Sequence, residues 1–127
     1  MSKDFSVTIK EASKELSAIE RIKLKDLTDA KNINNLVDSE GEQLIDVDMF
    51  ALLEVHNERS DDKDYEQFLI VAKDGSKYYT GSGSFIEAFY NIYDELKQEG
   101  IEDYTIKCYG VESKNYKGRF FLSCSLA

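Results

Sequence analysis

The sequence predicts a mainly β protein, of the β-rich α+β class, with one long helix. Short runs that alternate apolar and polar residues cover 44–56, 67–73, 103–111 and 119–127. Asp74-Gly75 stands between two apolar runs, 67–73 and 77–81, and this dipeptide is typical of a β-hairpin turn. The best helical pattern lies in 81–100, where apolar residues recur at spacings of three and four.

Length and composition predict one globular domain over 1–127, with an N-terminal extension over 1–40 and a core over 44–127. The chain has 127 residues, 42% of them hydrophobic, which is enough to bury a core without metal or disulfides. No long apolar run and no secretory signal are visible, so we expect a cytoplasmic protein with no membrane partner. Cys108 and Cys124 do not form a close-spaced pair, and buried thiols are favoured over a disulfide.

The N-terminal third carries the weakest patterns. Phe5, Val7 and Ile9 alternate with polar residues and predict a short strand. Residues 11–27 fit a short helix or turn followed by an edge strand, on which Arg21, Lys23 and Lys25 would align. Residues 28–43 are rich in turn-forming residues and are expected to be a loop.

The order of the clearer elements suggests a specific architecture. In the strand over 44–56, alternate residues from Ile45 to Val55 line one face, while Phe50 adds apolar character to the other. In the helix, Ser84 is the expected N-cap, and Gly100 suits the C-terminal end. Three strands, a helix and two strands follow the order of a five-stranded OB-like Greek-key barrel, with the helix between strands 3 and 4.

Charge is distributed unevenly along this acidic chain. The net charge is −9, which argues against general nucleic-acid binding. Residues 38–66 hold eleven acidic and two basic side chains, whereas residues 104–127 hold one acidic and four basic. The C-terminal end is therefore the part most capable of contacting phosphates.

Basic and aromatic side chains interleave near the C-terminus, a composition that is typical of surfaces that bind single-stranded nucleic acid. If Ile106, Cys108, Leu122 and Cys124 face the core, alternation places Lys107, Tyr109, Arg119 and Phe121 on one exposed face. Lys77 and one of the two tyrosines after it, assigned as Tyr79, would extend this face. The candidate nucleic-acid-binding residues are Lys77, Tyr79, Lys107, Tyr109, Lys114, Tyr116, Lys117, Arg119 and Phe121. An ordinary hairpin with a solvated tip would have the same composition.

Catalytic and metal-binding patterns are sparse. His56 is the only histidine, and no glycine-rich cofactor motif is present. Asp61, Asp62 and Asp64 cluster without the spacing of a calcium loop. We expect neither an enzyme nor a cofactor.

The order LIDVDMFALLEVHNE, QFLIVAKDGSKYYTGSGSF, helix and SKNYKGRFFLSC resembles small OB-fold single-stranded DNA-binding proteins of Gram-positive phages and mobile elements. The resemblance covers about residues 44–127 and implies a role in replication, recombination or transfer of an incoming element. It also implies contacts with replication or recombination proteins. The sequence ends in SCSLA and lacks the acidic tail of cellular single-strand binders.

The sequence therefore predicts a sequence-tolerant single-stranded DNA-binding protein. Tyr109, Tyr116, Phe121 and the stem of Lys107 would stack on bases or line the groove, and Lys114, Lys117 and Arg119 would contact phosphates. The alternative is a small acidic inhibitor that mimics DNA and binds a host DNA-processing protein through residues 38–66. A homo-oligomer, the preference between DNA and RNA and the site size stay open.

Overall fold

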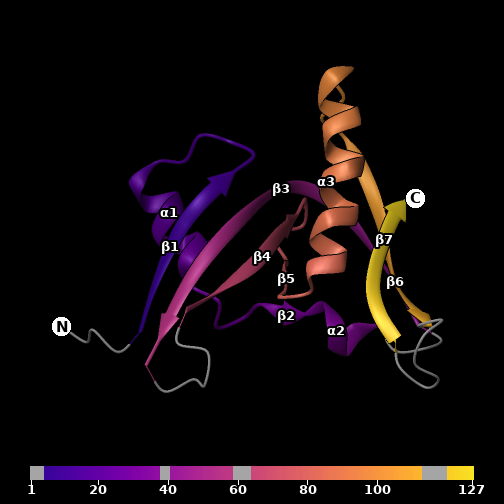
Figure 1. Cartoon of the computed structure of the whole chain (residues 1–127). Coiled ribbons are helices and arrows are strands. Elements are labelled where there is room, and N and C mark those ends of the chain that lie inside the picture. The colour runs from indigo at the N-terminus through magenta and orange to yellow at the C-terminus, as the bar shows by residue number, and fades with distance from the viewer. Residues whose placement is uncertain (1–4, 38–40, 59–63, 113–119) are drawn as a thin grey trace.

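The computed structural model describes residues 5–37, 41–58, 64–112 and 120–127. Within these ranges, seven strands form one sheet, accompanied by three helices (Figure 1). In chain order the elements are β1 Phe5–Ala12, α1 Ala18–Lys25, β2 Lys31–Asn32, α2 Ile33–Leu36, β3 Glu42–Asn57, β4 Asp64–Ala72, β5 Lys77–Thr80, α3 Gly83–Gln98, β6 Tyr104–Glu112 and β7 Phe120–Leu126. The mainly β class is confirmed, and the curled sheet is compatible with an OB-like fold.

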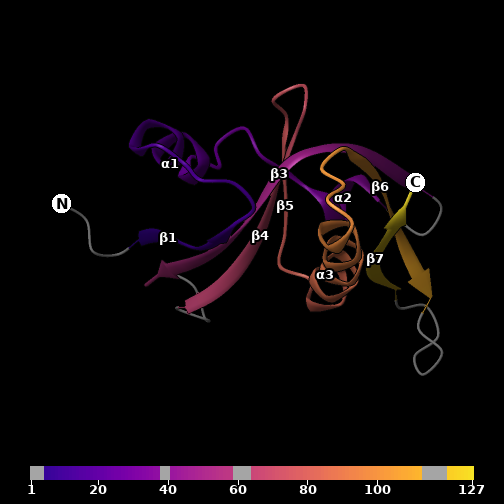
Figure 2. The same ribbon diagram turned by 90° about the horizontal axis from the view of Figure 1, so that it is seen from above.

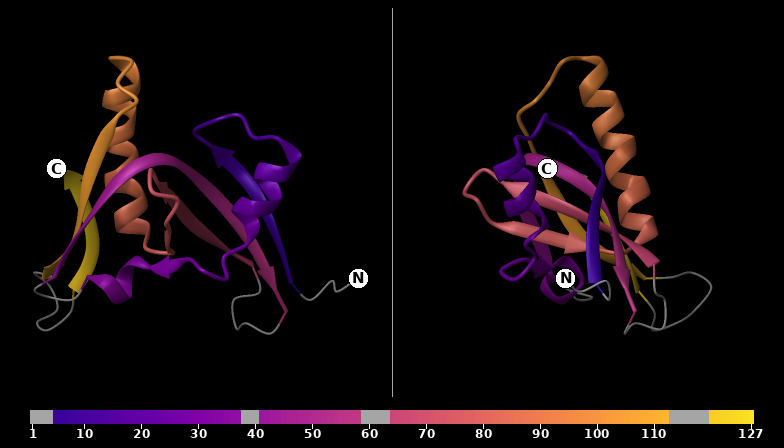
Figure 3. Two further views of the ribbon diagram at one scale, coloured as in Figure 1. Left: turned by 180° about the vertical axis from the view of Figure 1, so that it is seen from behind. Right: turned by 90° about the vertical axis from the view of Figure 1, so that its left-hand side faces the viewer.

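The long strand β3 organises the sheet, whose order is β2-β5-β4-β3-β6-β7 with β1 also paired to β3. One edge of β3 pairs with β4. The other edge pairs with β6 at its start, where Val47 lies opposite Tyr104, and with β1 at its end, where Val55 lies opposite Val7. Two strands thus share one edge of β3, and the sheet divides into two wings that diverge along the arch of β3 (Figure 3).

A β-bulge between Val47 and Met49 decides which face each residue of β3 uses. A bulge adds one residue to one strand of a pair and so interrupts the alternation of side chains. Ile45 and Val47 face the main core together with Phe50, whereas Met49 and the alternate residues after it face a second cluster. The expectation of one continuous apolar face from Ile45 to Val55 was wrong, but apolar cover on both sides of the strand is confirmed.

The main core lies between the sheet and α3. Phe85 and Phe89 of the helix are fully buried against Phe50 of β3 and Phe68 of β4. The rings of Phe50 and Phe89 meet edge to face at 4.9 Å, a favourable arrangement for aromatic pairs. The hydroxyl of Ser84 donates to the Leu122 carbonyl at 2.7 Å and ties the start of α3 to β7. The N-cap is Ser82, not Ser84 as expected.

A second apolar cluster lies on the opposite face of the sheet, under α1. Helices α1 and α3 lie on different sides of β3 (Figure 2). Leu24 is the buried residue of this helix, and it joins Leu53, Leu69 and their neighbours. Ser17 caps α1, and Glu20 completes a capping box with it. The edge strand expected over Arg21–Lys25 was therefore wrong: these residues continue the helix.

The segment before β3 contributes to the main core. Ile33 of α2 is completely buried there, and Val37 packs beside it. The hydroxyl of Thr80 donates to the Asn34 side chain at 2.7 Å, which links α2 to the end of β5. Residues 31–36, expected to be loop, thus form the short strand β2 and α2.

The predicted positions of the hairpin turn at Asp74-Gly75 and of the C-terminal end of the long helix are confirmed. β4 and β5 pair as antiparallel strands around Asp74-Gly75. Gly75 and Gly100 have φ values of 91° and 70°, a region that glycine enters without steric cost. Asp74 keeps a negative φ and its carboxylate accepts from the Ser76 amide at 2.8 Å, so only one turn residue uses the left-handed region.

Candidate nucleic-acid interface

The outer face of β6 and β7 gathers three of the predicted residues. In an antiparallel pair, residues directly opposite each other point to the same side of the sheet. Cys108 lies opposite Cys124, and both are buried in the core. The alternate positions Lys107, Tyr109 and Phe121 therefore share the other side of the sheet, opposite the core.

The same face extends onto the start of β3, where Lys107 lies opposite Leu44. Leu44 is 59% exposed and Phe121 is 44% exposed, unusually high values for large apolar side chains within strands. Tyr109 points to this side by alternation, but its half-buried side chain also packs against the main core, so the exposed apolar surface comes from Leu44 and Phe121. We call Leu44, Lys107, Tyr109 and Phe121 the outer-face cluster. It offers exposed ring and aliphatic surface for unpaired bases, with a cation beside it.

Lys107 can exchange its carboxylate partner for a phosphate group. Its ammonium lies 3.7 Å from the Glu42 carboxylate, and both side chains are largely exposed. Exposed ion pairs of this kind contribute only about 0–1 kcal/mol to stability. A phosphate group could therefore replace Glu42 as the partner of Lys107 at little cost.

Lys77 and Tyr79, the other two predicted residues with a described position, lie on β5 beneath the N-terminal segment. The Lys77 ammonium donates to the backbone carbonyls of Lys23 and Asp26, the latter at 2.9 Å. Tyr79 packs against the second cluster, which includes Leu24 of α1. Helix α1 and the residue that follows it therefore cover these two side chains.

The remaining predicted residues, Lys114, Tyr116, Lys117 and Arg119, lie outside the described residues. The strands that flank them end side by side, with Glu112 opposite Phe120. The segment that carries these four residues is thus attached at the Phe121 end of the outer-face cluster.

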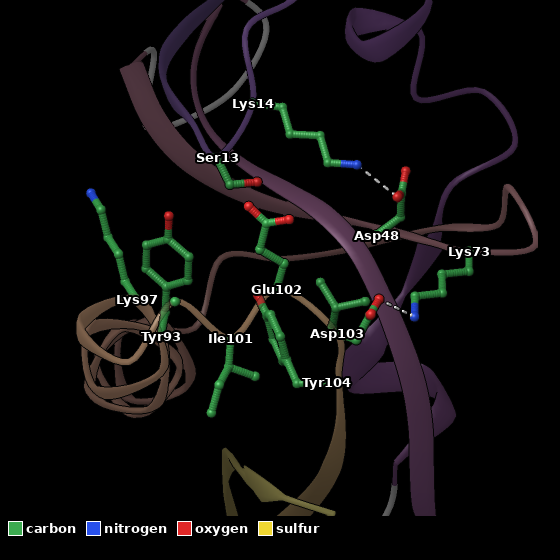
Figure 4. Close-up of a pocket in the computed structure, with 12 residues that line it drawn as sticks. Ser13, Lys14, Asp48, Lys73, Tyr93, Lys97, Ile101, Glu102, Asp103 and Tyr104 are labelled. Atoms are coloured by element: carbon green, nitrogen blue, oxygen red, sulfur yellow. Dashed lines mark hydrogen bonds and ion pairs between the residues drawn. The ribbon is translucent and has the colours of Figure 1, made fainter.

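A pocket that the sequence did not indicate opens where the two wings of the sheet separate (Figure 4). Its volume is about 360 Å³. It is lined by Ser13, Lys14, Val47, Asp48, Lys73, Tyr93, Lys97, Gly100, Ile101, Glu102, Asp103 and Tyr104. No local motif joins lysines so far apart in the chain, which is why the sequence carries no signal of this pocket. We call this the fork pocket.

Two ion pairs lie at the fork pocket. Lys14 contacts Asp48 at 2.8 Å, and Lys73 contacts Asp103 at 2.7 Å. Lys97 lies over the Tyr93 ring, 5.9 Å from its centre. The Asp103 carboxylate beside Lys73 has its pKa held below the usual value by that ammonium. Tyr104 stays neutral, because burial raises its pKa.

Potential metal ligands do not assemble in the described part of the chain. No cluster of three or more histidine, cysteine or acidic side chains is placed there to hold a metal ion. The His56 ring contacts Asp64 at 2.6 Å and Glu58 at 2.8 Å, and these hydrogen bonds raise its pKa. Within the described ranges, no helix is both long enough and apolar enough to cross a membrane.

Comparison with known families identifies the chain over most of its length. The family model described as "Phage Single-stranded DNA-binding protein" matches residues 10–127. No significant match was found among curated proteins or among solved structures. The matched range includes β3, β6 and β7, which form the outer face, and every residue of the fork pocket. The chain belongs to the phage single-stranded DNA-binding protein family, whose members are non-enzymatic DNA-binding proteins.

Proposed function

We propose that this protein binds single-stranded DNA without sequence preference during replication, recombination or transfer of a phage or mobile element. Membership of the phage family supports single-stranded DNA as the ligand. The observation that supports this location for the binding site is the outer-face cluster, where Phe121 and Leu44 are exposed on the same face as Lys107. Stacking on exposed rings tolerates any base, because every base has a π-face.

The proposed path of the single-stranded DNA starts at residues 113–119 and continues along the outer face. Lys114, Lys117 and Arg119 contact phosphates, and Tyr116 stacks on a base beside Phe121. Lys107 and Tyr109 continue the path along β6. Lys77 and Tyr79 join it only after α1 has moved, because the chain covers them.

The architecture we propose for this function is an OB-like barrel. Strands β3, β4 and β5, then α3, then β6 and β7 follow the order expected for its five strands and helix. Residues 1–40 are an addition that belongs to the same domain, supported by the pairing of β1 with β3 and the burial of Ile33.

The alternative of an acidic DNA mimic finds less support. Mimicry needs an array of carboxylates free to meet a basic partner. In the described part of residues 38–66, several carboxylates already contact a cation of this chain: Asp46, Asp48 and Glu66 contact Lys73, Lys14 and Lys10. Glu42 contacts Lys107 in the same way. Much of the acidic surface is thus neutralised internally.

Fluorescence anisotropy of a labelled oligo-dT, with a duplex of equal length as control, tests the proposal. We expect salt-sensitive binding to the single strand, because neutralising phosphates releases counterions. Phe121→Ala should weaken binding by about 1–3 kcal/mol, the usual contribution of one stacked base. Lys107→Ala should reduce the salt dependence.

Lys10→Ala is the matched control for Lys107→Ala. Both lysines are similarly exposed, 44% and 41%, and both contact a glutamate. Lys10 lies on β1, in the other wing of the sheet. Equal losses in the two variants would contradict the assigned face, and an absence of binding at low salt would refute the function.

A further inference from the structure

The fork pocket has a chemical composition suited to a nucleotide. Its wall includes two aromatic side chains, Tyr93 from α3 and Tyr104 from β6, beside the buried Val47. Three lysines, Lys14, Lys73 and Lys97, reach it from three separate elements of the chain. Pockets for small ligands have volumes of about 300–1,000 Å³ and combine an apolar wall with a few polar groups. At about 360 Å³ the fork pocket lies within this range.

The topology explains why the pocket exists. Because β6 and β1 pair with the same edge of β3, neither continues along the whole strand. The last pair with β6 is at Val47 and the first pair with β1 is at Ala51. The backbone of Ser13 bonds to Phe50 beyond the end of β1, and the gap between the wings opens beside it. The divergence of the strands therefore opens the gap, and the segments that leave β1, β4 and α3 supply most of its lining.

The pocket lies at the start of β6, the strand that carries Lys107 and Tyr109 of the outer face. A second hollow, of about 430 Å³, shares Lys73, Ile101, Asp103 and Tyr104 with it and reaches Asp46 and Thr105. Thr105 lies opposite Asp46 and points to the same side of β6 as Lys107. From Tyr109 to Tyr104 the strand covers about 17 Å at the usual rise per residue. A single strand of DNA on the outer face therefore leads directly to the fork.

The cations at the fork can accept phosphates. Lys97 has no carboxylate partner among the described residues and lies over the Tyr93 ring. Lys73 has two partner carboxylates, Asp103 at 2.7 Å and Asp46 at 3.6 Å, which are 87% and 56% exposed. The partner carboxylate of Lys14 is 44% exposed. Such exposed pairs contribute little to stability and are weakened by competing ions.

We propose that the fork pocket is a nucleotide subsite of the single-stranded DNA path: one unpaired base enters it beside Tyr93 and Tyr104, and the flanking phosphates contact Lys14, Lys73 and Lys97. This inference rests on the proposed function. It adds a second contact region on the α3 side of the sheet, so that bound DNA runs from residues 113–119 along β6 to the fork. Asp48 and Asp103 then oppose binding, since they pair with Lys14 and Lys73. The Glu102 carboxylate also lines the pocket and opposes binding through its charge (Figure 4).

The subsite is tested by measuring the affinity for oligo-dT by fluorescence anisotropy over a salt series. One pair of substitutions is expected to weaken binding and another pair to tighten it. Lys14→Ala with Lys97→Ala should weaken binding about tenfold and lower the salt slope by about 1.4, since each single-strand phosphate contact adds about 0.7. Asp48→Asn with Asp103→Asn should instead tighten binding several-fold, because Lys14 is released and Lys73 keeps only its longer contact with Asp46, at 3.6 Å. A merely destabilised fold would not produce tighter binding.

Glu66→Gln is the matched control for the tighter binding expected of the aspartate variants. Glu66 is 51% exposed and pairs with Lys10 at 3.0 Å, so the variant removes an equal charge from a similar pair in the other wing. If Glu66→Gln tightens binding as much as Asp48→Asn alone, the effect is that of net charge and the subsite is refuted.

Photo-cross-linking locates the base directly. An oligonucleotide containing 5-iododeoxyuridine is irradiated with the wild-type protein, and the cross-linked peptides are identified by mass spectrometry. We expect adducts on Tyr93 or Tyr104 in addition to those on the outer face. Adducts on the outer face alone refute the subsite but leave the proposed function intact. No salt-sensitive binding by the wild type would refute both. Labelling of the pocket by free 5-iododeoxyuridine monophosphate, but not by the oligonucleotide, would refute its place on the strand path.

Discussion

Individual side chains show how burial changes the chemistry of a residue. Cys108 and Cys124 lie opposite each other on β6 and β7, and both are buried. Burial raises the pKa of each thiol to about 12, so the nucleophilic thiolate is scarce at neutral pH. The two thiols are free, and the interpretation of them as core residues is confirmed.

We predict that neither thiol reacts with Ellman's reagent at pH 8 while the protein is folded. In denaturant both thiols should react within the time expected for a free cysteine, which provides the control. Rapid reaction of either thiol in the native protein would contradict the burial of this face.

His56 shows the opposite situation, an exposed ring whose carboxylate partners favour its charged form. Hydrogen bonds to Asp64 and Glu58 raise its pKa above the ordinary value of 6.5. A raised folded-state pKa adds stability that is fully present below the unfolded pKa and disappears as pH rises through the folded pKa.

We therefore predict that His56→Gln loses most stability, relative to the wild type, below about pH 6.5. The difference should shrink as pH rises through the higher folded pKa. Urea denaturation from pH 5.5 to 8.5 measures it, and NMR titration of this single histidine gives the pKa itself. A difference that does not change with pH would contradict the assigned pairing.

At the scale of elements, the N-terminal helix has a structural role on β5. Lys77 was a candidate nucleic-acid-binding residue, but its ammonium donates to carbonyls at the C-terminal end of α1. A cation at this position also interacts favourably with the helix dipole. The side chain thus links α1 to the sheet.

We predict that Lys77→Ala lowers the free energy of unfolding by about 1 kcal/mol, the typical contribution of a partly exposed hydrogen bond. Because α1 covers this side chain, affinity for oligo-dT should fall only if α1 moves when DNA binds. Lys25→Ala, on the exposed surface of the same helix, is the control and should leave stability within about 0.5 kcal/mol of the wild type. A selective loss of DNA affinity in Lys77→Ala would return this residue to the interface.

Local sequence signals predicted some elements well and others poorly, for identifiable reasons. The apolar stripe of α3 and the turn at Gly75 depend on interactions between neighbours in the chain, so both were read correctly. Residues 21–25 alternate like a strand, yet the capping box at Ser17 and the docking of Leu24 hold them in a helix. The bulge after Val47 leaves no clear mark in the sequence, because its effect appears only in the pairing with β4.

At the scale of the whole molecule, we expect the segment before β3 to belong to the same folding unit as the rest. β1 pairs with β3 over most of its length, and Ile33 is completely buried in the main core. Removing these residues would expose the second cluster and leave a large cavity beside Phe50 and its neighbours.

We predict that a chain of residues 41–127 shows no cooperative thermal transition by circular dichroism. The full chain should unfold in one transition, as small single domains usually do. A stable, cooperative fragment would show that residues 1–40 are an appendage that the core does not need.

The sequence by itself determined the strand-rich class, the long helix, the β4–β5 hairpin and the outward alternation of Lys107 and Phe121. Each of these follows from spacing along a single element or from the chemistry of one turn. Only the tertiary structure decided that α1 covers Lys77 and Tyr79, and that Lys14, Lys73, Lys97 and two tyrosines meet at the fork. These arrangements depend on which edge of β3 each strand occupies and on one bulge, and such long-range pairings are not encoded in any short stretch of sequence.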